Sequence, residues 1–257
     1  MAKTTGGSET GDGRIAAGGP TSWVMRLLGG RSFYPLFALL LVSLVFIVTG
    51  GEQRWAVFVG HILMAGSLLL AVRCAHASRI WIVLGWLGLI LGIAGAVLQA
   101  FTEVRALRLV SAVLFVLLLF ASLPLILRRL VAHSRVTGET VVGALCAYLL
   151  IGMDFAMLGV LLSTAEGGAI IASVANPGSA ITRSDIYYHS FITMTTVGYG
   201  DYVPLTGAAK TLALLEGILG QLFLVTVVAR LVSVATFRRI RSEEAAGPSA
   251  DESRPGA

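Results

Sequence analysis

Long apolar runs separated by short polar links dominate the chain. Four runs come first, two more flank a polar central segment, and together they cover about residues 33–48, 55–72, 80–101, 107–127, 140–162 and 208–237. Each run has roughly the length that an α-helix needs to cross a bilayer, about 20 residues. Because the links between the first four runs are short, neighbouring helices are expected to run antiparallel. The pattern predicts an all-α membrane protein with six transmembrane helices.

The segment between the fifth and sixth runs contains a shorter amphipathic stretch. Residues 185–195 mix apolar and polar side chains at helical spacing, and the stretch is too short to span a bilayer. A helix of this length is tolerated at membrane depth only where protein surrounds it, so we predict a re-entrant helix. Ser184 or Asp185 is expected to cap its start. The partial negative charge at its C-terminal end would favour a cation beyond it.

A glycine-containing loop follows this helix, and its sequence is TTVGYGD from Thr195 to Asp201. Gly198 and Gly200 lack a Cβ, so they adopt positive φ at little steric cost, and successive carbonyl oxygens can then face one side. A row of such oxygens, with the Thr196 hydroxyl at the inner end, can replace the water around an ion. The alternative is a glycine turn between two buried elements.

The loop resembles the pore loop of potassium channels, for which TVGYG is the standard example of a selectivity filter. The resemblance covers about residues 140–237 well and the six-helix plan more loosely. It implies a filter that binds the permeant ion K⁺ through the Thr196 hydroxyl and the carbonyls of residues 196–199, without a cofactor. The implied filter residues are Thr196, Val197, Gly198, Tyr199 and Gly200. Because one filter strand cannot surround an ion, we expect a homotetramer.

Further residues are expected to support the filter. The resemblance implies that Tyr187 and Tyr188 of the short helix pack around the filter, whereas interfacial aromatics are the alternative. Thr195 and Asp201 flank the filter directly.

Two acidic residues, Asp154 and Glu216, are expected behind the filter at similar depth. Each lies about eight residues from the outer end of its predicted helix. Bare carboxylates there are costly, so both should be protonated or paired. The candidate partners on the short helix are His189, Ser190 and Thr193. We expect Glu216 to brace the loop, and a carboxyl that is merely hydrogen-bonded in a helix contact is the alternative.

The sixth run resembles the inner, pore-lining helix of such channels. Gly220 lies where this family often has a hinge glycine, and Gly217 is a second candidate, with close packing as the alternative explanation for each. Four residues at helical spacing are expected to face the cavity and to form the gate: Gln221, Leu224, Val228 and Val232.

Composition and charge place the protein in a membrane. Of 257 residues 56 % are hydrophobic and 13 % charged, and the mean hydropathy is +0.85, which is too apolar for a soluble domain. The net charge of +5 does not indicate nucleic acid, because the basic residues sit at the ends of apolar runs. Their distribution predicts cytoplasmic termini in a plasma membrane protein (inner membrane if bacterial) that contacts lipid. Cys74 and Cys146 make no disulfide framework.

The predicted organisation has four parts. They are a disordered tail over residues 1–30, a four-helix transmembrane domain over 31–131, a pore domain over 138–240 and a second disordered tail over 241–257. The fourth run contains Arg105 and Arg108 but no arginine ladder after them.

These features predict a K⁺-selective channel that is not strongly voltage-gated. A non-conducting membrane receptor or scaffold that retains the channel fold is the alternative from another class. An enzyme is not expected, because no spacing of titratable residues suits a metal or an activated nucleophile.

Overall fold

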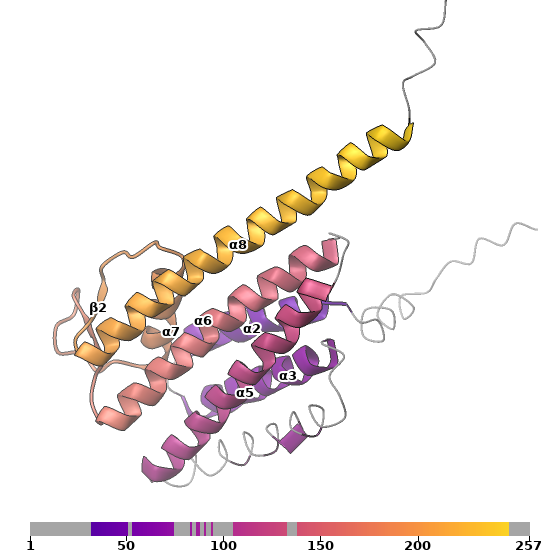
Figure 1. Ribbon diagram of the computed structural model, residues 1–257. Helices are drawn as coiled ribbons and strands as arrows, with labels where there is room; N and C mark the ends of the chain where they lie inside the picture. The colour runs from indigo at the N-terminus through magenta and orange to yellow at the C-terminus, as the bar shows by residue number, and fades with distance from the viewer. Residues whose placement is uncertain are drawn as a thin grey trace, which may run out of the picture.

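The protein is described from a computed structural model, which covers residues 32–50, 53–74, 105–132 and 138–246 and five positions between 83 and 94. The elements (Figure 1) are α2 (Tyr34–Thr49), α3 (Arg54–Cys74), α5 (Arg105–Ala132), α6 (Gly138–Glu166), β1 (Ile171–Ser173), α7 (Arg183–Met194), β2 (Tyr202–Pro204) and α8 (Gly207–Ala246). The predicted tail over residues 1–30 lies outside the described residues, as does nearly all of the predicted third span.

The helix bounds follow the apolar runs closely. Two helices in the described residues are long and apolar enough to cross a membrane: α6, with a hydropathy of 2.1, and residues 207–227 of α8, with a hydropathy of 1.5. The helical fold class is therefore confirmed in its coarse form. The two short strands were not predicted, so the description as all-α is incomplete.

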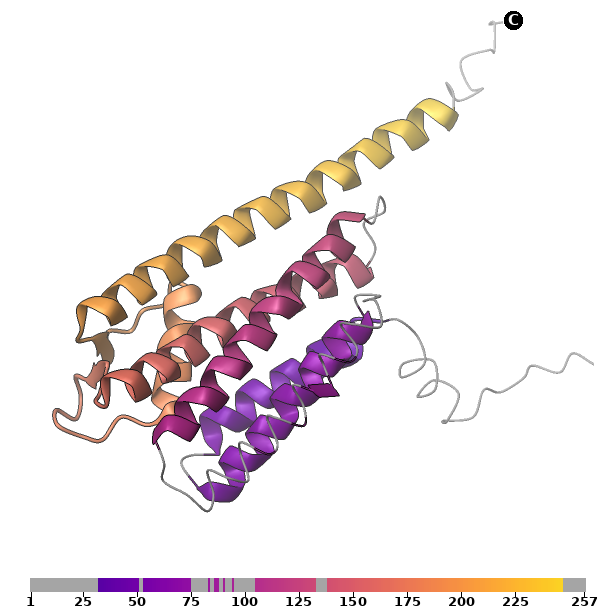
Figure 2. The ribbon, with the colours of Figure 1, turned by 60° about the horizontal axis from the view of Figure 1, so that its bottom comes forward.

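Helix α8 is longer than the sequence predicts. Its 40 residues span about 60 Å at 1.5 Å per residue. In Figures 1 and 2 its later half extends past the ends of the other helices. The prediction of a disordered tail from residue 241 is wrong for residues 241–246. The reason is local: Glu243, Glu244, Ala245 and Ala246 favour helix, and the first breakers, Gly247 and Pro248, come after them.

Helix α6 is the central element and packs against α2, α5, α7 and α8. In the most apolar stretch of α6, 67 % of the residues are buried, whereas 17 % are buried in the corresponding stretch of α8. A helix that is apolar all round is stable where other helices surround it, and α6 has such surroundings within one chain. Cys146 of α6 donates through its thiol to the Phe33 carbonyl at 3.7 Å, which joins α6 to the start of α2.

A small antiparallel sheet joins the segments on either side of α7 and the TVGYG loop, here called the candidate pore helix and the candidate filter. Strand β1 precedes α7, β2 follows the filter, and Ala172 pairs with Val203. Val174 N–H extends the pairing by donating to the Asp201 carbonyl at 2.8 Å. Pro204 lies at the end of β2, where its missing N–H does not interrupt a ladder.

Candidate pore loop

The pore helix α7 begins with a reciprocal cap. Thr182 is the N-cap: Asp185 N–H donates to Thr182 Oγ1 at 3.2 Å, and Thr182 N–H donates to Asp185 Oδ2 at 2.8 Å. The predicted cap at Ser184 or Asp185 is therefore wrong, although Asp185 takes part as the third residue of the helix. The T-x-x-D spacing of a capping box was the signal that would have identified Thr182.

The filter begins by turning its N–H groups back onto the pore helix. Val197 N–H and Gly198 N–H both donate to the Ile192 carbonyl, at 3.0 and 3.1 Å, and Thr196 N–H donates to the Thr193 carbonyl at 3.0 Å. These donors are therefore unavailable to the other side of the loop. Within the described residues, no backbone N–H donates to a carbonyl of residues 196–200.

Positive φ alternates along the filter. It occurs at Thr196 (60°), Gly198 (47°) and Gly200 (77°), and Thr196 is the one non-glycine residue with positive φ in the described part of the chain. Alternation of this kind turns successive peptide groups so that their carbonyls can share one side. A β-branched residue at positive φ is uncommon and tends to occur at functional sites. Residues 195–200 are all exposed on the single chain.

Side chains hold the outer end of the filter. The side chain of Asp201 raises the pKa of the Tyr188 phenol, first as a hydrogen-bond acceptor, then with burial and through its negative charge. The rings of Tyr188 and Tyr202 pack edge to face, with their centroids 5.8 Å apart. Tyr202 donates to Asp185 Oδ1 at 2.7 Å. Tyr188 and Asp201 are thus brought together, whereas the role of Tyr202 was not predicted.

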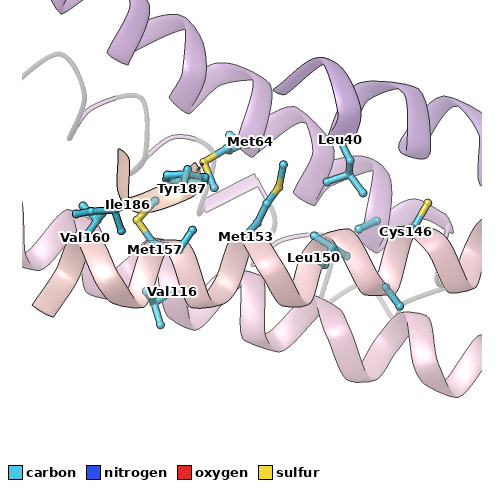
Figure 3. Close-up of a cluster of buried hydrophobic side chains, with 14 of the residues drawn as sticks. Leu40, Met64, Val116, Cys146, Leu150, Met153, Met157, Val160, Ile186 and Tyr187 are labelled. Atoms are coloured by element: carbon cyan, nitrogen blue, oxygen red, sulfur yellow. Dashed lines mark hydrogen bonds between the residues drawn. The ribbon is translucent and has the colours of Figure 1, made fainter. Parts of the chain in front are cut away.

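Tyr187, by contrast, points away from the filter. Its ring is fully buried, and its hydroxyl donates to Met64 Sδ of α3 at 3.4 Å. Figure 3 shows Tyr187 beside Met64, in the core cluster with Met157 and Ile186. The prediction that Tyr187 packs around the filter is wrong, because its position on α7 faces the first helices.

Glu216 of α8 reaches the pore helix. It is buried and hydrogen-bonds to Ser190, one of the three predicted partners. Ser190 Oγ is also within 3.0 Å of the Gly152 carbonyl of α6. A hydroxyl has one hydrogen, so Ser190 satisfies both neighbours only if a protonated Glu216 donates to it. The arrangement joins α6, α7 and α8 behind the filter.

Replacing Ser190 with alanine is expected to lower the stability of the protein by about 1–3 kcal/mol, because it leaves the buried Glu216 carboxyl without its partner. Thermal unfolding in detergent measures the effect. Ser233→Ala, at an exposed position of α8, is the matched control. Equal melting temperatures for both variants and the intact protein would argue against a stabilising contact between Ser190 and Glu216.

Asp154 does not join this arrangement. It is 1 % exposed, and among the described residues neither carboxylate oxygen has a hydrogen-bond partner. Gly152, two residues earlier and therefore about 200° around the helix, faces Met194 and Phe191 of α7. Asp154 thus lies on a different side of α6 from the one that meets Met194 and Phe191. Of the two predicted outcomes, pairing with His189, Ser190 or Thr193 is wrong, and a protonated carboxyl stays the prediction.

Because an unpartnered buried carboxyl is unfavourable, Asp154→Leu is expected to raise the free energy of unfolding by about 1–3 kcal/mol. Thermal unfolding measures this change in the free energy of unfolding, and Asp154→Asn, which keeps a polar group, is the comparison. A clear loss of stability in the leucine variant would mean that Asp154 has a stabilising role.

The two candidate hinge glycines have different surroundings. A Cβ on Gly220 would lie 2.6 Å from Met194 Cγ and 3.2 Å from the Met194 carbonyl, whereas a Cβ on Gly217 would meet nothing within 4 Å. Close packing on the pore helix therefore explains Gly220 but not Gly217. Of the predicted cavity residues, Gln221 is exposed and Leu224 half-buried. The side chains of Val228 and Val232 lie outside the described part of the chain.

Comparison with known proteins supports the resemblance. Residues 143–237 match the family described as "Ion channel". Over 86 residues the chain is 38 % identical to "TWiK family of potassium channels protein 7" from Caenorhabditis elegans, an alignment that covers 34 % of this chain and 15 % of the relative. The chain thus spans a small part of that relative. Residues 143–237 are similar to an ion channel. This stretch contains α7, the filter and most of α6.

Proposed function

We propose that the protein is a K⁺-selective channel that conducts passively across the plasma membrane. The filter backbone carries the proposal: positive φ alternates from Thr196 to Gly200, and the carbonyls of this stretch accept from no backbone N–H of the described residues. Carbonyl oxygens of this kind can replace the hydration shell of K⁺. The C-terminal end of α7, directly before the filter, adds a partial negative charge.

The same proposal requires four chains around one axis, because a single filter strand contributes only one side of an ion site. The surface of α8 supports it. Apolar residues at i, i+4, i+8 and i+11 form one exposed face: Leu214, Ile218, Leu222 and Val225. Contact with a neighbouring subunit would cover such a face, since contiguous exposed apolar surface marks interaction sites. The remaining spans and cytoplasmic termini complete the proposed six-helix subunit.

Purified protein in liposomes tests the function. We expect K⁺ efflux down its gradient and a particle mass of four chains. Gly198→Ala serves as the filter-defective control, because it leaves the helices intact. A protein that is a tetramer but passes neither K⁺ nor Na⁺ under varied pH, tension and lipid would favour a non-conducting receptor or scaffold.

Voltage is not expected to be the main gate. Moving one charge through the field is worth about 2.3 kcal/mol per 100 mV, and helix α5 has only Arg105 and Arg108 before Arg128. Open probability measured over a wide voltage range should therefore change little. Steep activation that disappears when Arg105 and Arg108 are neutralised would contradict this prediction.

A further inference from the structure

A single carboxylate binds both the start of the pore helix and the chain that leaves the filter. Asp185 Oδ2 accepts from Thr182 N–H in the cap of α7, at 2.8 Å. Asp185 Oδ1 accepts from the Tyr202 hydroxyl at 2.7 Å. Tyr202 is the first residue of β2 and follows Asp201 directly. The outer ends of α7 and of the filter are therefore joined through one side chain.

The outer half of the filter depends on such contacts. The pore-helix carbonyls hold the inner half through the N–H groups of residues 195–198. Within the described residues, no N–H from Tyr199 to Asp201 makes a backbone hydrogen bond. The outer end is instead held by Val174 N–H, which donates to the Asp201 carbonyl, and by the Tyr202 hydroxyl, which donates to Asp185.

We propose that Asp185 and Tyr202 form an outer clamp that positions the outer end of the filter for K⁺ conduction. The inference rests on the proposed channel function and assigns both side chains as positioning residues. The C-terminal end of α7 holds the start of the filter. The clamp joins the other end of α7 to the point where the chain leaves the filter. Loss of the hydroxyl of Tyr202 would leave the ring contact with Tyr188 but free the strand from the cap.

The clamp is expected to be constant near neutral pH. The other titratable groups that act on Tyr202 are Asp201 and Tyr188. The elements that carry or adjoin the clamp also contain Arg183 and His189 on α7, Glu166 at the end of α6 and Lys210 in the first turn of α8. Burial alone would raise the pKa of Asp185, but hydrogen bonds from Thr182 and Tyr202 outweigh burial and lower it. The hydrogen bond to Asp185, with burial, raises the pKa of Tyr202 to about 12.

The directions of the two pKa shifts define the pH range over which the clamp stabilises the structure. A lowered carboxyl pKa contributes stability above the ordinary value of about 3.9, which is lost as the pH falls through the lower folded value. A raised phenol pKa contributes stability below the ordinary value of about 10, which is lost as the pH rises through about 12. Between about pH 5 and 9 the effect of removing the clamp should therefore not vary with pH.

The test compares Tyr202→Phe with the intact protein in liposomes. When external K⁺ is lowered, we expect the K⁺ flux of Tyr202→Phe to decay about threefold to tenfold faster, because a charge-assisted bond that is partly exposed is lost. Amide hydrogen exchange over residues 196–204 should rise in the same variant. Tyr34→Phe, a half-exposed tyrosine at the start of α2, is the matched control and should leave both readouts unchanged.

Asp185→Ala provides a second variant, which should reproduce the faster exchange and also loosen the start of α7. Unchanged flux decay and unchanged exchange in Tyr202→Phe would overturn the clamp. If the intact protein passes no K⁺, the proposed function fails while the exchange comparison still decides whether the clamp holds this loop.

Discussion

Replacing Gly198 with alanine is expected to abolish K⁺-selective flux and leave the helices folded. Gly198 has a φ of +47°, and a Cβ added there would meet nothing within 4 Å. The expected defect is therefore backbone strain and not crowding. An L-residue at such a φ costs about 1–2 kcal/mol, and the proposed pore would contain this strain four times. Relaxation to negative φ would rotate the neighbouring carbonyls out of the row.

Flux of K⁺ and Na⁺ in liposomes, with circular dichroism for the fold, measures the outcome. Gly207→Ala is the matched control: it also meets nothing within 4 Å, and its φ is not positive. It should conduct as the intact protein does. Normal selectivity in Gly198→Ala would mean that this residue does not need its positive φ for conduction.

Replacing Gly220 with alanine is expected to displace the end of the pore helix. The new Cβ would lie 2.6 Å from Met194 Cγ and 3.2 Å from the Met194 carbonyl. Met194 is fully buried and ends α7, and its carbonyl also accepts from the Tyr148 hydroxyl at 3.3 Å. Neither the Met194 backbone nor Tyr148 can move freely. We therefore expect the free energy of unfolding to fall by about 1–3 kcal/mol in each chain, and K⁺ flux to be reduced.

Gly217→Ala separates packing from hinging. A Cβ at Gly217 meets nothing within 4 Å, and alanine favours helix over glycine by about 1 kcal/mol. The variant should therefore be slightly more stable, and it should lose flux only if Gly217 acts as a hinge. Thermal unfolding and flux, measured on both variants, decide between the two roles. A stable and fully active Gly220→Ala would contradict the packing explanation.

The sequence was most informative where one local rule dominates. Uninterrupted apolar runs predicted α2, α3, α5 and α6 within a few residues, because a membrane helix is defined by length and hydropathy. The TVGYG loop predicted the positions of positive φ at Gly198 and Gly200, because only glycine adopts this geometry readily. Depth along two helices gave Ser190 as one of three candidate partners for Glu216, and the two residues are hydrogen-bonded.

The sequence was least informative where the rotation of a helix decides a contact. Counting residues gave Asp154 the same depth as Glu216 but not its direction, so its pairing was misjudged. The same limit applies to Tyr187, which is next to Tyr188 in sequence but faces α3. Strand β1 was missed because its pairing with β2 depends on the chain returning after the filter, which no local pattern encodes.

The reversal potential of the intact protein under mixed ions tests the central claim most directly. With K⁺ on one side of the bilayer and Na⁺ on the other, a filter of ordered carbonyls should hold the reversal potential close to the K⁺ equilibrium value. A reversal potential near zero, which means equal permeability to K⁺ and Na⁺, would contradict the assignment of Thr196 to Gly200 as a potassium selectivity filter.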